Sequence, residues 1–199
     1  MTTTLPAPDG LSIHPVTPAR WNDLEVLFGP EGAYKGCWCA FWRLRQKDFQ
    51  AADDADRRAH LKSRVDACDP PPGLLVYRGD EPVGWVSVEP REHFEAYQYS
   101  PVYTAIDDVP VWHVSCFFMR DDHRGAGLMT PLLEAVKAHV AANGGVAVEG
   151  YPEDPSEDSS SSTPGYQGYI PAFERAGFEE VARLSNDRPV FRVSLEDEA

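Results

Sequence analysis

The clearest alternation of hydrophobic and polar positions lies in the second half of the chain. Residues 109–119, VPVWHVSCFFM, form an uninterrupted run of apolar and strand-forming residues, which is typical of a strand buried on both faces. After a short turn, apolar residues recur at intervals of three and four over residues 129–140, and this spacing predicts a helix with one buried face. Residues 145–152, GVAVEGYP, predict another strand. These three elements make a β-α-β unit.

Further elements are predicted on both sides of this unit. Upstream we expect a short strand at 11–17, a helix beginning at Thr17-Pro18, a polar helix within 47–67 and a β-hairpin over 73–90. Downstream, the acidic and serine-rich residues 152–165 predict a solvated loop. A short helix at 169–178 and strands at 179–184 and 189–195 complete the chain. The order predicts an α+β fold around one mixed sheet.

Size and composition favour one folded domain. The chain has 199 residues, of which 42% are hydrophobic and 25% charged, and this is typical of a globular protein. We expect residues 1–10 to be a flexible N-terminal tail and residues 11–199 to be the domain. No leader-like or membrane-length apolar run is present in the sequence, so we expect a cytoplasmic protein with its four cysteines reduced.

The net charge bears on the kind of partner. Asp and Glu outnumber Lys and Arg by 32 to 18, which gives a formal charge of −14. Attraction to nucleic acid or to a membrane surface is therefore disfavoured, whereas the negative electrostatic potential of the protein favours a cationic ligand such as an amine. Solubility alone explains the acidity equally well.

The turn at the start of the 129–140 helix has the composition of an anion site. In HRGAGLM, Gly125 and Gly127 carry no side chain that would hold the backbone away from a ligand. The helix N-terminus supplies unpaired N–H groups and partial positive charge, and Arg124 adds a charged donor. The sequence thus predicts a phosphate cradle, although two glycines that merely turn the chain would look the same.

In its context this turn resembles that of the GNAT superfamily of acetyl-CoA-dependent N-acetyltransferases. That family places Q/R-x-x-G-x-G/A between a central strand and a helix, and RGAGLM matches except at Met129, where Gly or Ala is expected. The hairpin, the central strand, the strand after the helix and FERAGFEEV also stand where the family has its elements, so the likeness covers residues 73–194 well. It implies a single domain with a mixed, mostly antiparallel sheet flanked by helices.

The resemblance also implies an activity. It implies transfer of an acetyl group from acetyl-CoA to a primary amine of a small molecule or peptide, by direct attack in a ternary complex. A non-catalytic acyl-CoA-binding or interaction module is the alternative. The backbone of Phe117 and Met119 would pair with the pantetheine arm of the cofactor. The pyrophosphate would be held by Arg124, Gly125, Ala126, Gly127, Leu128 and Met129.

The general acid of the family has no direct counterpart. Members often protonate the departing thiolate with a tyrosine on the helix before the Gly-Phe pair, and that position is Phe173 here. Phenylalanine has no proton to donate. Tyr166, Tyr169, solvent or no residue takes this role.

A base is also useful, because an ammonium ion has no lone pair with which to attack. His113 is the candidate: alternation along the strand predicts that it shares a face with Phe117 and Met119, and its position matches the glutamate base of the histone-acetyltransferase branch of the family. A core histidine that is simply hydrogen-bonded is the competing interpretation.

The remaining candidates concern the acceptor, metals and assembly. Tyr34, Trp38 and Trp42 lie in the segment that covers the acceptor side in the resembled fold, where they would form an apolar or cation-binding wall or belong to the core. We expect no metal, because the CWC pair is too closely spaced for structural zinc. Nucleophilic chemistry at Cys116 is disfavoured because His113 should lie on the opposite face. The closing strand pair at a sheet edge suits a homodimer.

Overall fold

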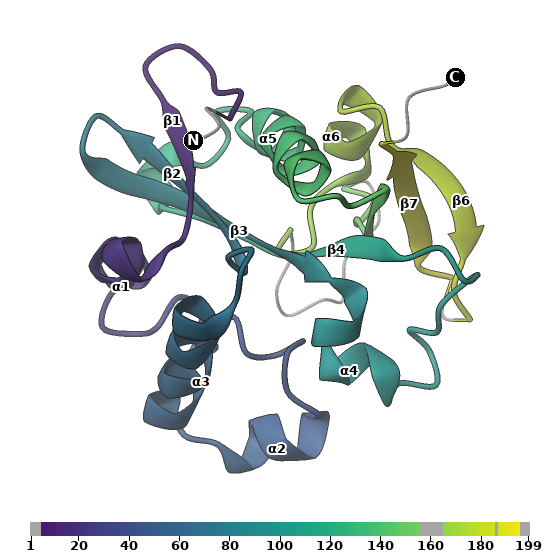
Figure 1. The fold of residues 1–199 in the computed structure, drawn as a ribbon, viewed down its shortest axis with the longest axis horizontal. Coiled ribbons are helices and arrows are strands. Elements are labelled where there is room, and N and C mark those ends of the chain that lie inside the picture. The colour runs from purple at the N-terminus through teal and green to yellow at the C-terminus, as the bar shows by residue number, and fades with distance from the viewer. Residues whose placement is uncertain (1–4, 156–164, 186, 196–199) are drawn as a thin grey trace.

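The computed structural model describes residues 5–155, 165–185 and 187–195. Within them the chain forms one seven-stranded sheet in the order β1-β2-β3-β4-β5-β7-β6 (Figure 1). The strands are β1 (Ser12–Pro15), β2 (Gly73–Arg78), β3 (Glu81–Pro90), β4 (Val111–Met119), β5 (Ala147–Gly150), β6 (Glu179–Arg183) and β7 (Pro189–Ser194). The α-helices are α1 (Trp21–Phe28), α2 (Gln46–Ala51), α3 (Asp54–Ala67), α4 (Glu95–Gln98), α5 (Met129–Ala142) and α6 (Ile170–Arg175). The predicted α+β architecture is confirmed.

The sheet opens between its two parallel strands. Among the described strands, β4 and β5 form the one parallel pair, and their register ends where Val114 lies opposite Gly150. β5 stops there, whereas β4 continues to Met119 and stays paired with β3 on its other side. Residues 115–119 therefore have a backbone edge that no described strand covers.

Helices lie on both faces of the sheet. α5 and α6 lie on one face, and α1, α2, α3 and α4 lie on the other (Figure 1). The α5 side buries the largest core cluster, to which α5 contributes Leu132, Leu133 and Val136. On the opposite face, residues of α1 and α3 pack around Trp85 of β3. Because both faces are covered, β3 and β4 are buried on both sides, as their apolar composition predicts.

The polar segment predicted as one helix forms two. α2 ends at Ala51 and α3 begins at Asp54. Asp53 starts the second helix with a capping box: its carboxylate accepts the Asp56 N–H at 2.9 Å, and the Asp56 carboxylate accepts the Asp53 N–H at 3.2 Å. These bonds satisfy backbone donors that the first turn of a helix leaves unpaired.

A β-bulge at Ser115 interrupts the regular alternation of β4. Ser87 pairs with Cys116, and the next residue of β3, Val88, pairs with Val114, so Ser115 is the extra residue. Its hydroxyl is hydrogen-bonded to that of Ser87 at 2.8 Å. One extra residue shifts the alternation of side chains beyond it by one position.

The bulge separates residues that simple alternation puts together. Val114 and Phe117 both pack in the core cluster beneath α5, whereas Cys116 packs toward the cluster around Trp85. His113 points to that opposite face and contacts the ring of Tyr97 in α4 and that of Phe94 just before it. The expectation that His113 shares a face with Phe117 and Met119 is wrong, because it assumed a regular strand.

The predicted N-terminal tail is described only in part. Residues 1–4 lie outside the described residues, and Leu5 is 5% exposed and packed in the α5-side core. In the described part of the chain, no helix has the length and apolar content needed to span a bilayer.

Candidate active site

The turn between β4 and α5 leaves backbone N–H groups available. Gly125 and Gly127 have φ of 73° and 72°, a left-handed conformation that glycine adopts without steric penalty. No atom lies within 4 Å of where a Cβ would stand at either position. The amides of residues 125–128 have no hydrogen-bond partner among the described residues. Since α5 begins at Met129, the positive end of its dipole adds to these donors, and the turn suits an anion.

A cavity of about 770 Å³, the turn cavity, lies against these residues. Its far wall is formed by Tyr166, Tyr169 and the first turns of α6. Ala126 is absent from its lining. The other residues predicted to hold the cofactor all line it: Phe117, Met119, Arg124, Gly125, Gly127, Leu128 and Met129.

The open edge of β4 forms part of this cavity. The Phe117 N–H donates to the Tyr166 carbonyl with an N···O distance of 2.6 Å. The chain around Tyr166 therefore lies alongside the strand edge at the point where β5 has ended. This is the backbone position at which an extended, amide-containing ligand would pair.

Met129 replaces the small residue of the resembled motif without closing the turn. Its sulfur accepts a hydrogen bond from the Tyr169 N–H at 3.3 Å. It also lies 3.3 Å from the position of a Cβ on Gly168. The side chain thus packs against the segment that forms the far wall of the turn cavity.

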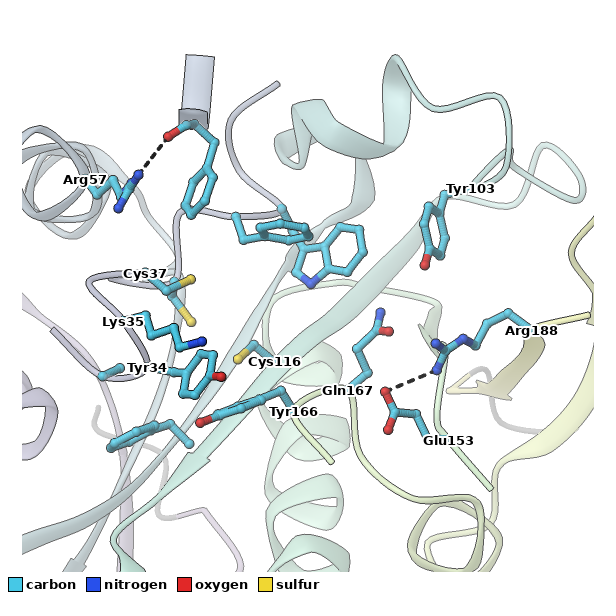
Figure 2. Close-up of a pocket in the computed structure, with 16 residues that line it drawn as sticks. Tyr34, Lys35, Cys37, Arg57, Tyr103, Cys116, Glu153, Tyr166, Gln167 and Arg188 are labelled. Atoms are coloured by element: carbon cyan, nitrogen blue, oxygen red, sulfur yellow. Dashed lines mark hydrogen bonds and ion pairs between the residues drawn. The ribbon is translucent and has the colours of Figure 1, made fainter. Parts of the chain in front are cut away.

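A second cavity, of about 490 Å³, lies on the α2–α4 side of the sheet. We call it the aromatic cavity, because the rings of Tyr34, Phe41, Trp42, Phe49, Tyr103, Phe118 and Tyr166 line it. Figure 2 shows Tyr34, Lys35 and Cys37 on one side, and Tyr103, Glu153 and Arg188 on the other, with Gln167 and Cys116 between. The predicted acceptor residues Tyr34 and Trp42 are part of this wall.

Two tyrosines lie where the cavities meet. Tyr34 and Tyr166 line both, and their ring centroids are 5.4 Å apart (Figure 2). Burial raises the pKa of Tyr166, against the opposing charge of Arg124, so the phenol stays protonated near neutral pH. Tyr166 therefore stands between the two cavities with a proton to donate.

Sequence reasoning missed Glu153, which it placed in a solvated acidic loop. Glu153 is 9% exposed, pairs with Arg188 at 3.4 Å and accepts the Gly165 N–H at 3.1 Å. It also forms a parallel β-bridge with Tyr169. Tyr151 and Pro152 before it are buried too, so the solvated-loop prediction is wrong at its start, whereas residues 156–164 lie outside the described residues. The apolar Tyr151-Pro152 pair after β5 was the available signal.

The loop that carries Tyr34 is held in an unusual backbone conformation. Ala33, Lys35, Trp38 and Cys39 all have positive φ, between 45° and 67°. Each such non-glycine residue is strained by about 1–2 kcal/mol, and such strain gathers at functional sites. The surrounding structure must therefore stabilise the loop.

Arg43 provides that stabilisation. Its guanidinium donates to the Cys39 carbonyl at 2.8 Å and to the Pro72 carbonyl at 3.0 Å. It also pairs with Glu89 of β3 at 2.8 Å, and both residues are at most 2% exposed. One buried ion pair thereby fixes the wall of the aromatic cavity to the central sheet.

His113 lies outside both cavities. It is fully buried, with its ring 4.4 Å from that of Tyr151 and 4.7 Å from that of Tyr97. Burial, with a smaller contribution from the charge of Arg91, lowers its pKa well below the usual value. Neither ring nitrogen has a hydrogen-bond partner among the described residues. His113 is thus a neutral core residue. Regular alternation along β4 would have placed it beside the cofactor residues, but the bulge at Ser115 turns it to the other face.

Two other residues singled out from the sequence also lie in the core. Trp38 is 7% exposed and packs against Trp21 and Phe28, so it supports the loop without lining either cavity. Phe173 is fully buried among Phe117 and other aromatic rings. The structure therefore brings together Tyr34, Trp42, Tyr166, Tyr169 and the turn, but not His113 or Trp38.

A model of the acetyltransferase (GNAT) family matches residues 38–155, which is more than half of the chain. No curated protein sequence matches it. Among solved structures, yncA from Salmonella typhimurium with its cofactor acetyl-CoA superposes with a TM-score of 0.55 at 17% identity, covering 96% of this chain and 97% of that one. An N-acetyltransferase from Staphylococcus aureus gives 0.55 at 14% identity, covering 94% and 99%. An agmatine N-acetyltransferase gives 0.55 at 16% identity, covering 94% and 100%.

Proposed function

Because the chain belongs to the acetyltransferase (GNAT) family, we propose that it transfers an acetyl group from acetyl-CoA to a primary amine of a small molecule or peptide. The observation that carries this proposal is the meeting of two cavities at Tyr34 and Tyr166. One cavity has an anion-binding turn and an open strand edge, and the other has an aromatic wall with a buried carboxylate. The amine attacks the acetyl carbonyl directly, in a ternary complex.

The turn cavity has the features that a nucleotide thioester requires. Unpaired amides at residues 125–128 and the start of α5 would hold the pyrophosphate, with Arg124 as an added donor. The edge of β4 at Phe117 and Met119 would align the pantetheine arm. When bound, acetyl-CoA supplies the activated acetyl group. Pairing at the Phe117 N–H requires the Tyr166 carbonyl to release it.

Tyr166 is the proposed general acid. Attack by the amine breaks the C–S bond and leaves a thiolate, which Tyr166 protonates from the junction of the cavities. Its raised pKa keeps it in the protonated form that this role needs. Tyr169 lines only the turn cavity and is the second candidate.

Glu153 is the proposed recognition group for the amine. Its carboxylate lines the aromatic cavity and, beside its pair with Arg188, would accept a hydrogen bond from an ammonium group, while Trp42 and Tyr103 offer ring faces to the body of the acceptor. His113 has no place in this proposal, because it is enclosed in the core. The amine proton passes to solvent in the cavity before attack.

Thiol release from acetyl-CoA, measured against a panel of amines, polyamines, amino acids and aminoglycosides, tests the proposal. Agmatine is included because one structure similar to this chain is an agmatine N-acetyltransferase. A parallel thermal-shift titration with coenzyme A measures binding alone. Turnover with one acceptor class supports the proposal, and stabilisation without turnover favours the acyl-CoA-binding module. Absence of stabilisation would contradict the assignment of the turn cavity.

A pair of matched substitutions separates the acid from general effects. Tyr166→Phe keeps the ring and removes the hydroxyl, and we expect kcat to fall at least about 10-fold with little change in the KM for acetyl-CoA. Tyr99→Phe removes the same group from a tyrosine that is 57% exposed and lines neither cavity, so it should leave both parameters unchanged. Equal kcat values for the two variants would assign the proton to Tyr169 or to solvent.

A further inference from the structure

Three of the four cysteines line the aromatic cavity. They are Cys37 and Cys39 on the strained loop and Cys116 on β4. The bulge at Ser115 is what turns Cys116 toward this face. Figure 2 shows the Cys116 sulfur directed into the cavity beside Tyr34 and Tyr166. None of these thiols has a role in the transfer reaction proposed above.

Cys39 has the surroundings of a stabilised thiolate. The Trp85 indole N–H donates to its sulfur at 3.1 Å. The Arg43 guanidinium, which binds the Cys39 carbonyl, places a positive charge beside it. The neighbouring Cys116 thiol outweighs the opposing effect of burial and lowers the pKa of Cys39, and Arg43 and Trp85 lower it further.

Cys116 is the complementary partner. Its thiol donates to the Phe117 carbonyl at 3.6 Å, and the neighbouring Cys39 sulfur together with burial raises the pKa of Cys116 well above the usual value. The two sulfurs therefore differ in acidity, and both line the same solvent-connected cavity and pack in the cluster around Trp85. A low-pKa sulfur beside a second cysteine is the arrangement that oxidants convert to a disulfide.

The backbone at Cys39 is fixed at an energetic cost. Trp38 and Cys39 are both left-handed, with φ of 45° and 51°. Packing alone would be served equally by a relaxed loop with a small apolar residue at this position. The buried Arg43–Glu89 pair instead holds this sulfur against Trp85.

We propose that Cys39 and Cys116 form a peroxide-reactive dithiol in the wall of the aromatic cavity. The Cys39 thiolate attacks the terminal oxygen of a hydroperoxide, the O–O bond breaks, and the departing alkoxide or hydroxide takes a proton. The resulting sulfenic acid is attacked by Cys116, the S–O bond breaks, and water leaves. Two thiols and one hydroperoxide thus give one disulfide, one alcohol or water, and one water. The disulfide ties the loop to β4 and narrows the cavity between them.

Mass spectrometry of the full-length protein tests this directly. The protein is treated with a few equivalents of hydrogen peroxide, alkylated with iodoacetamide without reductant, and mapped. We expect a loss of two hydrogen atoms and a Cys39–Cys116 linked peptide, both reversed by dithiothreitol. A Cys37–Cys39 link, or oxidation beyond sulfenic acid without any link, would overturn the proposal.

Three variants assign the roles. Cys116→Ser should stop at a sulfenic acid on Cys39 that dimedone traps. Cys39→Ser should slow the consumption of peroxide at least about 10-fold, because Cys116 is the less acidic thiol. Cys68→Ser removes a cysteine outside the cavity and should change nothing. Dimedone labelling of Cys116 instead of Cys39, or equal peroxide consumption by all three variants, would refute the assignment.

The disulfide should affect one cavity and spare the other. We expect oxidised protein to keep its stabilisation by coenzyme A and to lose acceptor turnover at least about 10-fold, restored by dithiothreitol. The mass measurement does not need turnover, so it stands even where the proposed transferase activity fails. Unchanged turnover in fully linked protein would refute the effect on the cavity.

Discussion

Replacing Glu89 by glutamine should destabilise the protein in a way that depends on pH. Burial alone would raise the pKa of Glu89, but the charge of Arg43 and hydrogen bonds from His93 and Arg64 outweigh it and lower the pKa from 4.5 to about 2. A depressed carboxyl pKa stabilises the fold above the pKa of the unfolded chain, and this stabilisation is lost as the pH falls toward the folded pKa. The window for Glu89 therefore runs from about pH 4.5 down to about pH 2.

The magnitude follows from the same shift. A difference of about 2.5 pKa units corresponds to about 3 kcal/mol of unfolding free energy at pH 7. At pH 3.5, where much of the unfolded carboxyl is protonated, the contribution falls to about 2 kcal/mol. This agrees with the loss of about 3–5 kcal/mol expected when one partner of a buried ion pair is removed.

Urea unfolding of wild type and Glu89→Gln at both pH values measures the effect. Glu95→Gln is the matched control, since Glu95 also pairs with an arginine, Arg45, at 3.4 Å, but the two side chains are 50% and 36% exposed. An exposed pair contributes only about 0–1 kcal/mol. A loss of unfolding free energy for Glu89→Gln no greater than that for Glu95→Gln at pH 7, or an equal loss at pH 3.5, would contradict a stabilising role for the charge of Glu89.

Three further substitutions test the turn, the wall and the core. Gly127→Ala, at φ 72° in open space, should weaken the thermal stabilisation that coenzyme A gives. The control is Gly79→Ala in the β2–β3 turn, which is also left-handed and open. It should lower the melting temperature and leave the stabilisation by coenzyme A unchanged. Gly168→Ala, at φ 87°, would place a Cβ 2.7 Å from the Phe173 ring, so urea titration should show a loss of about 2–4 kcal/mol of unfolding free energy. The control Gly144→Ala is also left-handed but meets no neighbour, and it should lose about 1 kcal/mol. Phe173→Tyr restores the residue type of the resembled family but buries a hydroxyl in the core, so we expect about 1–3 kcal/mol of destabilisation and no rise in kcat. A higher kcat would mean that a side chain at this position does contact the reacting groups.

Local pattern was enough to predict the elements around the turn. Helical spacing located α5, the uninterrupted apolar run located β4, and the glycines of RGAGLM located the turn between them. These signals are local, because each depends on residues within one or two turns of one another. The cofactor residues predicted from the resemblance accordingly line one cavity, apart from Ala126.

Features that depend on pairing between distant segments were not predictable. The bulge at Ser115 depends on how β3 pairs with β4, and it moves His113 away from Phe117. Glu153 is enclosed because Gly165, Tyr169 and Arg188, which lie further along the chain, contact it. The placing of Cys39 and Cys116 in the wall of one cavity needs both the bulge and the strained loop, and neither has a signal in the alternation of apolar and polar residues.

The hydrogen bond from the Phe117 amide to the Tyr166 carbonyl also bears on how ligand affinity is distributed. A ligand that pairs with this amide exchanges one backbone bond for another, and such an exchange is nearly neutral in free energy. Strand pairing at this position therefore sets the direction of an extended ligand and adds little to its affinity. Binding strength has to come from its two ends, the phosphate at the turn and the group that reaches the two tyrosines. Until a ligand arrives, the same bond keeps the open strand edge from pairing with another protein chain.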